Sequence, residues 1–179
     1  MDIKVLENLQ ARTDSKLRYA EIHLNELKEI HPNCGSDFDR AHQESFLFHL
    51  IGARDSFLLE LNAYYGLDLL DNNVKVHTMF AKIGKLKKTV PEFDELYILQ
   101  KDGSSWLFHA LEMRNHSTHI SHIARSYHLG GVNHQKVWLK IPTNEHIIEI
   151  HFVDLFSDWL IKMRALLERL RNSSIKRNS

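Results

Sequence analysis

The scarcity of residues that interrupt a helix is the feature that most restricts the fold of this chain. Only 7 glycines and 3 prolines occur in 179 residues, and they fall at few places along the sequence. Because glycine and proline are the strongest breakers of helical structure, long stretches without them favour long helices joined by short connections. The sequence therefore predicts an all-α protein, a four-helix-type up-and-down bundle with extra short helices.

Apolar residues recur at steps of three and four along the longest of these stretches, which is the spacing of one helix face. The second stretch carries the widest stripe, built on Phe46, Leu50, Ala53 and Phe57 with further apolar residues beside it. A stripe this wide suits a helix that packs against two neighbours in a bundle. The expected long helices span 3–29, 37–65, 105–126 and 153–172, with a shorter helix over 73–87 and another opened by Pro91.

Two runs near the C-terminus alternate with a period of two instead. They are "GGVNHQKVWLKIP" and "TNEHIIEIHF", and a Pro-Thr-Asn turn signal lies between them. This pattern predicts a small β-hairpin, inserted at about 132–152 before the last helix. The sequence thus predicts a single helical-bundle domain over 1–172 and a disordered polar tail over 173–179. Ser104 is expected to cap the helix that follows it.

Charge and cysteine content exclude several classes of protein. Lys plus Arg and Asp plus Glu are 23 each, so the formal net charge is zero, which argues against a general polyanion binder but not against a local basic site. Cys34 is the single cysteine, so no intrachain disulfide is expected. The N-terminus has no signal-peptide core and no apolar run is long enough to span a bilayer. We expect a cytoplasmic protein that does not associate with a membrane.

The stretch "EMRNHSTHISH", residues 112–122, is the candidate for chemistry. It places one arginine, three histidines and several hydroxyl groups on the polar second half of a predicted helix. Within it, Arg114 is followed by the polar Asn115 and, five residues after the arginine, by His119. This arrangement resembles the signature of the HEPN superfamily (higher eukaryotes and prokaryotes nucleotide-binding), an arginine, a polar residue and a histidine on a late helix of an all-α bundle. Other segments, among them "HLIGARDSFLLELN", look similar to an uncharacterised bacterial group of this bundle type.

The resemblance implies a function and a set of site residues. Many members of that superfamily are metal-independent endoribonucleases that dimerise, with the two Arg–His pairs facing each other across the interface. By this resemblance Arg114 and His119 form the site pair, Asn115 orients it, and no cofactor is needed. We therefore expect RNA binding and cleavage by a homodimer. Arg54 and Asp55 on the second helix, together with His116, are expected to support the site.

The two residue types suit the chemistry of RNA cleavage by its own 2′-hydroxyl. Histidine has an unperturbed pKa near neutrality, which suits an acid or base, and arginine suits the charge on the phosphorus. Along a helix, five residues separate the two Cα atoms by about 7.5 Å of rise and turn the direction by about 140°. Arg114 and His119 therefore do not share one narrow stripe, and we expect them to flank a groove.

Two other interpretations remain open from the sequence. In the first, Arg114 is a structural tie to a carboxylate such as Asp55 or Glu60, and the protein is a non-catalytic interaction module with a protein partner. In the second, His116, His119 and His122 belong to a metal site. They repeat every three residues, so one straight helix cannot easily direct all three at one ion. His23, His42 or His49 on the first two helices would complete such a site across the bundle.

Overall fold

The computed structural model describes residues 3–29, 37–119, 125–126, 136–140, 145–148 and 152–176. Its side chains are described over 3–29, 37–117 and 152–173. Six α-helices lie within this described part, so the predicted all-α helical bundle is confirmed. They are α1 (Ile3–Glu29), α2 (Asp37–Tyr64), α3 (Val76–Leu86), α4 (Pro91–Lys101), α5 (Trp106–His119) and α6 (Phe152–Lys176), and a short 3-10 helix, η1 (Asp71–Asn73), precedes α3.

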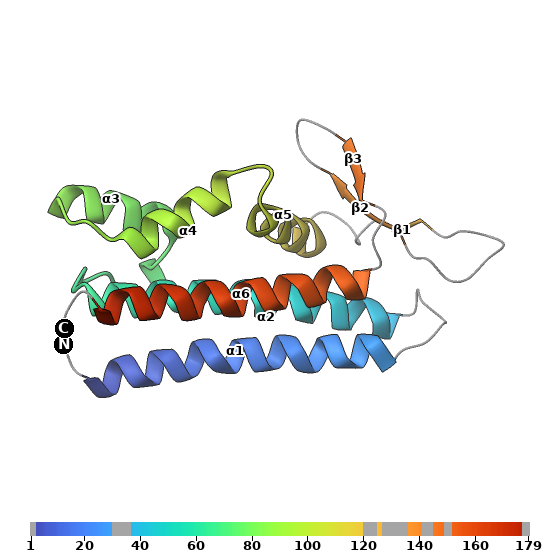
Figure 1. Ribbon diagram of the computed structural model, residues 1–179, viewed down its shortest axis with the longest axis horizontal. Coiled ribbons are helices and arrows are strands. Elements are labelled where there is room, and N and C mark those ends of the chain that lie inside the picture. Colours follow the sequence, from blue (N-terminus) through green and yellow to red (C-terminus); the bar gives the residue numbers. More distant parts are fainter. Residues whose placement is uncertain are drawn as a thin grey trace.

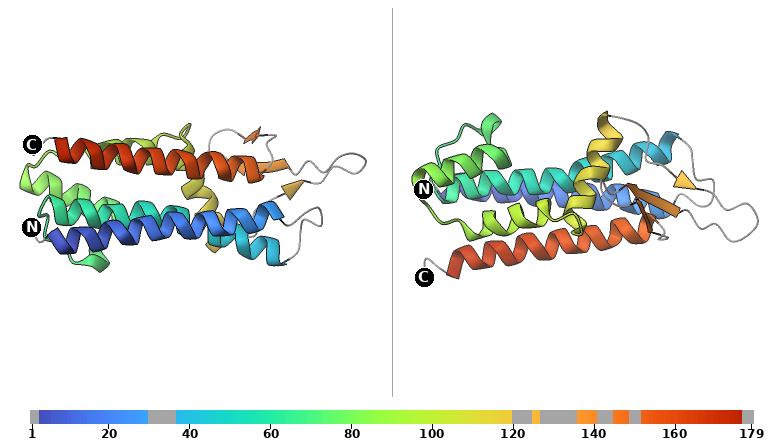
Figure 2. Two further views of the ribbon diagram at one scale, coloured as in Figure 1. Left: turned by 60° about the horizontal axis from the view of Figure 1, so that its bottom comes forward. Right: turned by 90° about the horizontal axis from the view of Figure 1, so that it is seen from above.

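The three longest helices lie side by side, and the three shorter ones cover one side of them (Figure 1). Helix α1 runs antiparallel to α2 and to α6, so the beginning of α1 and the end of α6 lie at the same end of the bundle (Figure 2). Helix α4 lies along α6, whereas α5 crosses the long helices and contacts α2, α4 and α6. This crossing places the polar half of α5 beside the middle of α2.

The core forms where the apolar stripes of these helices meet. Helix α1 contributes Leu17, Ala20, Leu24 and Leu27, which are spaced by three or four residues as expected for one buried face. The largest buried rings come from α2 and α6. Phe46 of α2 stacks on Phe156 of α6, with ring centroids 4.5 Å apart, and Phe156 also contacts Trp159. Trp159 is 2% exposed, as expected for a core residue.

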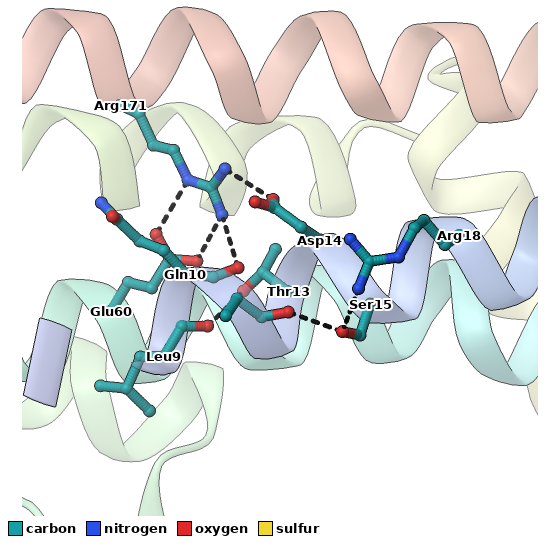
Figure 3. Close-up of polar contacts among 9 residues, drawn as sticks. Leu9, Gln10, Thr13, Asp14, Ser15, Arg18, Glu60 and Arg171 are labelled. Atoms are coloured by element: carbon teal, nitrogen blue, oxygen red, sulfur yellow. Dashed lines mark hydrogen bonds and ion pairs between the residues drawn. The ribbon is translucent and has the colours of Figure 1, made fainter. Parts of the chain in front are cut away.

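A polar network beside this core joins the three long helices (Figure 3). Arg171 of α6 donates hydrogen bonds to both carboxylate oxygens of Glu60 of α2, from Nε at 2.9 Å and from Nη2 at 2.8 Å. Its Nη1 donates to Asp14 of α1 at 2.8 Å. Burial lowers the pKa of Arg171, but the hydrogen bonds to Glu60 and Asp14 outweigh that effect and raise its pKa overall. Glu60 is therefore the partner of Arg171 and not, as the sequence left open, of Arg114.

Helix α5 begins one residue later than the sequence predicted, because the cap is Ser105 rather than Ser104. The Ser105 hydroxyl accepts a hydrogen bond from the backbone N–H of Phe108 at 3.0 Å and donates one to the carbonyl of Leu99. Ser104 instead donates its hydroxyl hydrogen to Asp102. The serine nearer the core satisfies an otherwise unpaired N–H at the helix start, which explains the difference.

Ser105→Ala is expected to destabilise the protein by about 1 kcal/mol, because it removes the side chain that caps α5. Ser104→Ala is the matched control. It changes an exposed neighbour that does not cap the helix, and its effect should stay within about 0.5 kcal/mol. Urea unfolding of the two variants measures the difference, and equal losses of stability would show that Ser105 is not the cap.

The described residues between α5 and α6 form three strands. They are β1 (Arg125–Ser126), β2 (Lys136–Lys140) and β3 (Glu145–Ile148), in the order β1-β2-β3. Strands β2 and β3 are antiparallel with Val137 opposite Ile148, and β1 is antiparallel to β2 with Arg125 opposite Val137. The sequence placed Arg125 and Ser126 at the end of a helix, which is wrong. The second half of the predicted helix has no apolar face to bury, so packing does not stabilise it as a helix. Pairing with β2 provides the backbone hydrogen bonds of these two residues instead.

The last helix is longer at both ends than the sequence predicted. Phe152 was expected at the end of the second strand, but it opens α6 and is 4% exposed, because its ring packs against the core ring of Phe156. At the other end α6 continues through Lys176, into the residues expected to form a disordered tail. No glycine or proline interrupts this polar segment, and Ser173 donates a hydrogen bond to the carbonyl of Arg169 one turn earlier.

Candidate functional site

The candidate site residues of two helices meet in one pocket. Arg54 and Asp55 of α2 and Arg114 and Asn115 of α5 all line a pocket of about 610 Å³. The crossing of α5 over the middle of α2 brings these pairs together, although they are about 60 residues apart in sequence. The other lining residues are Val74, Lys75, Val76, Gln100, Lys101, Phe108, Leu111 and Glu112.

Arg54 is the most buried cation of the pocket, at 8% exposure. Its Nη1 donates a hydrogen bond to Oε1 of Gln100 at 2.8 Å, and its Nη2 donates to Oδ1 of Asp55. Its Nε is buried without a hydrogen-bond partner among the described residues. A buried guanidinium that keeps an unpaired N–H is costly in free energy, so Arg54 is not explained by packing alone.

Arg114 lies beside Arg54 and shares its carboxylate partner. Its Nη2 is 3.9 Å from Oδ2 of Asp55, and its Nη1 donates a hydrogen bond to Oδ1 of Asn115 at 3.1 Å. Asp55 is therefore the carboxylate that both arginines contact, and of the two partners that the alternative interpretation named for Arg114, Asp55 is the one beside it. The tie is a loose one, because the ion pair is long and the Asp55 side chain is 46% exposed.

A second pocket, of about 250 Å³, adjoins the first, and Asp55, Val74 and Arg114 line both. Helix α1 adds Arg12 and Lys16 to the second one. We call the two pockets together the basic groove. Its cationic side chains are Arg12, Lys16, Arg54, Lys75, Lys101 and Arg114, and its carboxylates are Asp55, Asp71 and Glu112.

The basic groove is thus a local excess of positive charge on a chain whose formal net charge is zero. Sequence reasoning missed four of these cations: Arg12 and Lys16 of α1, Lys75 immediately before α3, and Lys101 at the end of α4. On an isolated helix such residues look like an ordinary solvated face. Only the packing of α1 and α5 against α2 places them around one groove, where their fields add.

The structure describes only part of the histidine set in residues 112–122. His116 is half-buried on α5, one residue beyond Asn115. His119 is the last residue of α5, and its side chain and the whole of His122 lie outside the described part of the chain. Across the residues whose side chains are described, no group of three or more His, Cys, Asp or Glu side chains is arranged to hold a metal ion.

Three other histidines do meet, between α1 and α2. Nδ1 of His23 lies 3.2 Å from Nδ1 of His42, and the His23 ring stacks on that of His49 with centroids 5.5 Å apart. Burial, and then the neighbouring His42, lower the pKa of His23. Burial, followed by Lys16 and His23, lowers the pKa of His49 to about 4. His23 and His49 are therefore neutral imidazoles at neutral pH.

The lowered pKa of His49 predicts an acid-sensitive fold. Because the unfolded chain takes up a proton near pH 6.5 and folded His49 only near pH 4, its contribution to stability is complete above pH 6.5 and is lost as the pH falls toward 4. Allowing for its partial exposure, we expect a loss of about 1–2 kcal/mol. Melting temperatures across this range should fall less steeply for His49→Leu than for the wild type, whereas His77→Leu, at an exposed histidine of α3, should follow the wild type. Parallel curves for wild type and His49→Leu would contradict this.

None of the helices in the described residues combines the length and the apolar character needed to cross a membrane.

Comparisons with known proteins give a family but no activity. No curated protein and no solved structure significantly matches this chain. One family model does match, over residues 7–176, and its description is "Family of unknown function (DUF6586)". The match covers α1 from its second turn and extends to the last residue of α6. The chain therefore belongs to the DUF6586 family of unknown function.

Proposed function

We propose that this protein binds RNA in the basic groove and cleaves it without a metal ion, as a HEPN-type endoribonuclease. The observation that carries the proposal is the convergence of Arg54, Asp55, Arg114 and Asn115 on one pocket of about 610 Å³. All four residues are among the candidate site residues that the sequence predicts. The excess of cations around them provides what a phosphate backbone requires.

The proposal includes the finer architecture. We propose that α1, α2, α6 and the segment formed by α4 and α5 are the four helices of a HEPN-like up-and-down bundle, and that the protein works as a homodimer. The antiparallel course of α1 relative to α2 and α6 supports this arrangement. In a dimer the grooves of both copies would be available to one RNA strand.

The reaction balances with the groups of this chain alone. The 2′-hydroxyl of the RNA loses its proton to His119 and attacks the adjacent phosphorus. The bond from phosphorus to the 5′-oxygen of the next nucleotide breaks, and that oxygen takes up a proton from the protonated His119 of the second copy in the proposed homodimer. The products are a 2′,3′-cyclic phosphate and a free 5′-hydroxyl. His119 serves as the acid or base, and Arg114 stabilises the charge that develops on the phosphate oxygens.

The surrounding residues give Arg114 its orientation in this scheme. Asn115 accepts a hydrogen bond from Nη1 of Arg114, and Asp55 lies near Nη2. Arg54, held by Gln100 and Asp55, places a second fixed cation in the same pocket. Two guanidinium groups on one carboxylate are partly neutralised in the absence of RNA, and a phosphate would compete with Asp55 for them.

The ion pair between Asp55 and Arg114 also favours a second candidate function. If the pair only fixes α2 against α5, the protein is a non-catalytic module that binds a protein partner. The two functions differ in what the groove does with RNA. The catalytic function requires cleavage products with defined ends, and the interaction module gives none.

The test is cleavage of total RNA by the purified protein in EDTA, followed by analysis of the new RNA ends. We expect 2′,3′-cyclic phosphate and 5′-hydroxyl ends from the wild type and from His77→Ala, an exposed control on α3. A variant carrying both Arg114→Ala and His119→Ala should give none, which excludes a contaminating nuclease. Intact RNA at micromolar wild-type protein would overturn the catalytic proposal and leave the interaction module. Light scattering of the same sample tests the homodimer.

A further inference from the structure

A row of aromatic and imidazole rings lies along the face shared by α1 and α2. Phe48 contacts His49, His49 contacts Tyr19 and stacks on His23, His23 contacts His42, and His42 contacts Phe38, with centroid separations of 5.2, 5.2, 5.5, 5.1 and 4.3 Å in that order. We call these six residues the ring row: Tyr19 and His23 of α1, and Phe38, His42, His49 and Phe48 of α2.

The large rings of this row are exposed. Phe38 is 56% exposed, Phe48 55% and Tyr19 46%, and the neighbouring Ile22 is 54% exposed. A single exposed aromatic residue is ordinary on a protein surface, but three exposed rings joined through histidines on two adjacent helices form a candidate binding face. The histidines between them are half-buried, so they support the exposed rings from below.

The ring row begins at the basic groove. Phe48 lines the smaller pocket together with Arg12, Lys16 and Arg114. Nζ of Lys16 lies 4.8 Å from the centroid of the Phe48 ring, which places a cation directly over an exposed aromatic face. The same end of the row therefore carries both a positive charge for a phosphate and a ring for a base.

We propose that the ring row is a base-stacking extension of the basic groove, along which unpaired bases of single-stranded RNA stack while the groove holds the backbone. This inference rests on the proposed function and specifies its substrate class. Single-stranded binding sites combine a positively charged groove with aromatic side chains in this way, because every base offers a flat face whatever its sequence. A duplex hides those faces, so the row selects unpaired strands.

The electrostatics of the row fit this role. His23 and His49 have lowered pKa values and are neutral at neutral pH, so they add rings rather than charges. Phosphate binding is thereby left to Arg12, Lys16 and the other cations of the groove. Phe38 and Phe48 are ten residues apart on α2, which corresponds to about 15 Å of helix rise. At about 3.4 Å per nucleotide of a stacked strand, the row has room for about four bases.

Fluorescence anisotropy with a single-stranded RNA of about 12 nucleotides tests the inference. We expect Phe48→Ala to raise the Kd about 5- to 100-fold, and Tyr19→Ala to do the same to a smaller extent, because stacking of each base is lost. Phe48→Trp should retain binding, and the new indole should be quenched when RNA binds. Ile161→Ala, at an exposed apolar residue of α6 outside the row, should bind as the wild type does. RNA duplex of the same length should bind more weakly and should not respond to Phe48→Ala.

The possible failures are distinguishable. One outcome separates the two proposals. If the wild type binds the RNA strand, Arg114→Ala weakens that binding, and Phe48→Ala has the same Kd as Ile161→Ala, the ring row does not contact the RNA. The proposed function then stands. If wild type does not bind RNA at all, both proposals fail. If Phe48→Ala leaves the Kd unchanged but reduces the molar mass in light scattering, the row is a contact between two copies of the chain, which also overturns the inference. Unchanged melting temperatures of the variants show that the effects are on binding.

Discussion

Arg171→Leu is expected to lower the free energy of unfolding by about 3–5 kcal/mol, the range found when one partner of a buried ion pair is removed. Its partner Glu60 is only 3% exposed and accepts two hydrogen bonds from the Arg171 guanidinium. Without Arg171 the Glu60 carboxylate would be buried and ionised without a counter-charge. Asp14 of α1 would lose its hydrogen bond from the same side chain. The contact of α6 with both other long helices would be weakened at once.

The matched control is Arg169→Leu on the same helix. Arg169 also makes two hydrogen bonds to one glutamate, Glu95, but its side chain is 58% exposed, so its loss should cost less than about 1 kcal/mol. Combining Glu60→Leu with Arg171→Leu removes both charges and should recover much of the stability lost in the single variant. Urea unfolding measures all three. If Arg171→Leu were as stable as Arg169→Leu, the contacts of Arg171 with Glu60 and Asp14 would not stabilise the fold as a buried ion pair does.

The long helices were predictable because each is stabilised mainly by burying one apolar face, whose residues recur every three or four positions in the sequence. The bounds of α1 match the prediction of 3–29, and α2 ends one residue before the predicted end. Gly66, with a positive φ of 54°, lies two residues after the last residue of α2, and this conformation is available to glycine at little cost. Here a local signal and the tertiary packing favour the same boundary.

The region after α5 could not be predicted in the same way, because its structure depends on residues distant in sequence. No glycine or proline separates Arg125 and Ser126 from the helix before them, yet they pair with Val137 and Lys136 of β2. Phe152 alternates with the strand residues before it, yet it packs against Phe156 in the core. When a short segment fits both the helical period of 3.6 residues and the strand period of two, tertiary contacts decide which structure it adopts.

The candidate site was predictable in part. Arg114, Asn115, Arg54 and Asp55 were chosen by motif and position, and they line the same pocket. Which carboxylate would pair with Arg114 was not predictable, because Asp55 and Glu60 lie on the same helix and only the positions of α5 and α6 assign one to each arginine. The ring row had no sequence signal either, since α1 and α2 each supply only some of its rings.

On the proposed function, Arg114→Ala is expected to lower kcat/KM for RNA cleavage about 100- to 1000-fold, the effect of removing one donor that stabilises charge in a transition state. The loss should be in kcat as well as in KM, because the guanidinium acts on charge that grows as the phosphorus is attacked. Arg114→Lys should recover only part of the rate. A lysine keeps the charge but lacks the planar set of donors that can reach a phosphate and Asn115 together.

The control for Arg114 is Arg40→Ala, because Arg40 is a half-exposed arginine of α2 whose ion pair with Asp37 lies outside the basic groove. It should cleave as the wild type does.

Asp55→Ala distinguishes the effect of the charge in the groove from the effect of orienting Arg114. It removes the carboxylate that Arg54 and Arg114 share, so the groove becomes more positive and RNA should bind more tightly. Cleavage should nevertheless slow, because Arg114 loses one of the contacts that orient it. Faster cleavage by Asp55→Ala would show that Asp55 only competes with the substrate for Arg114.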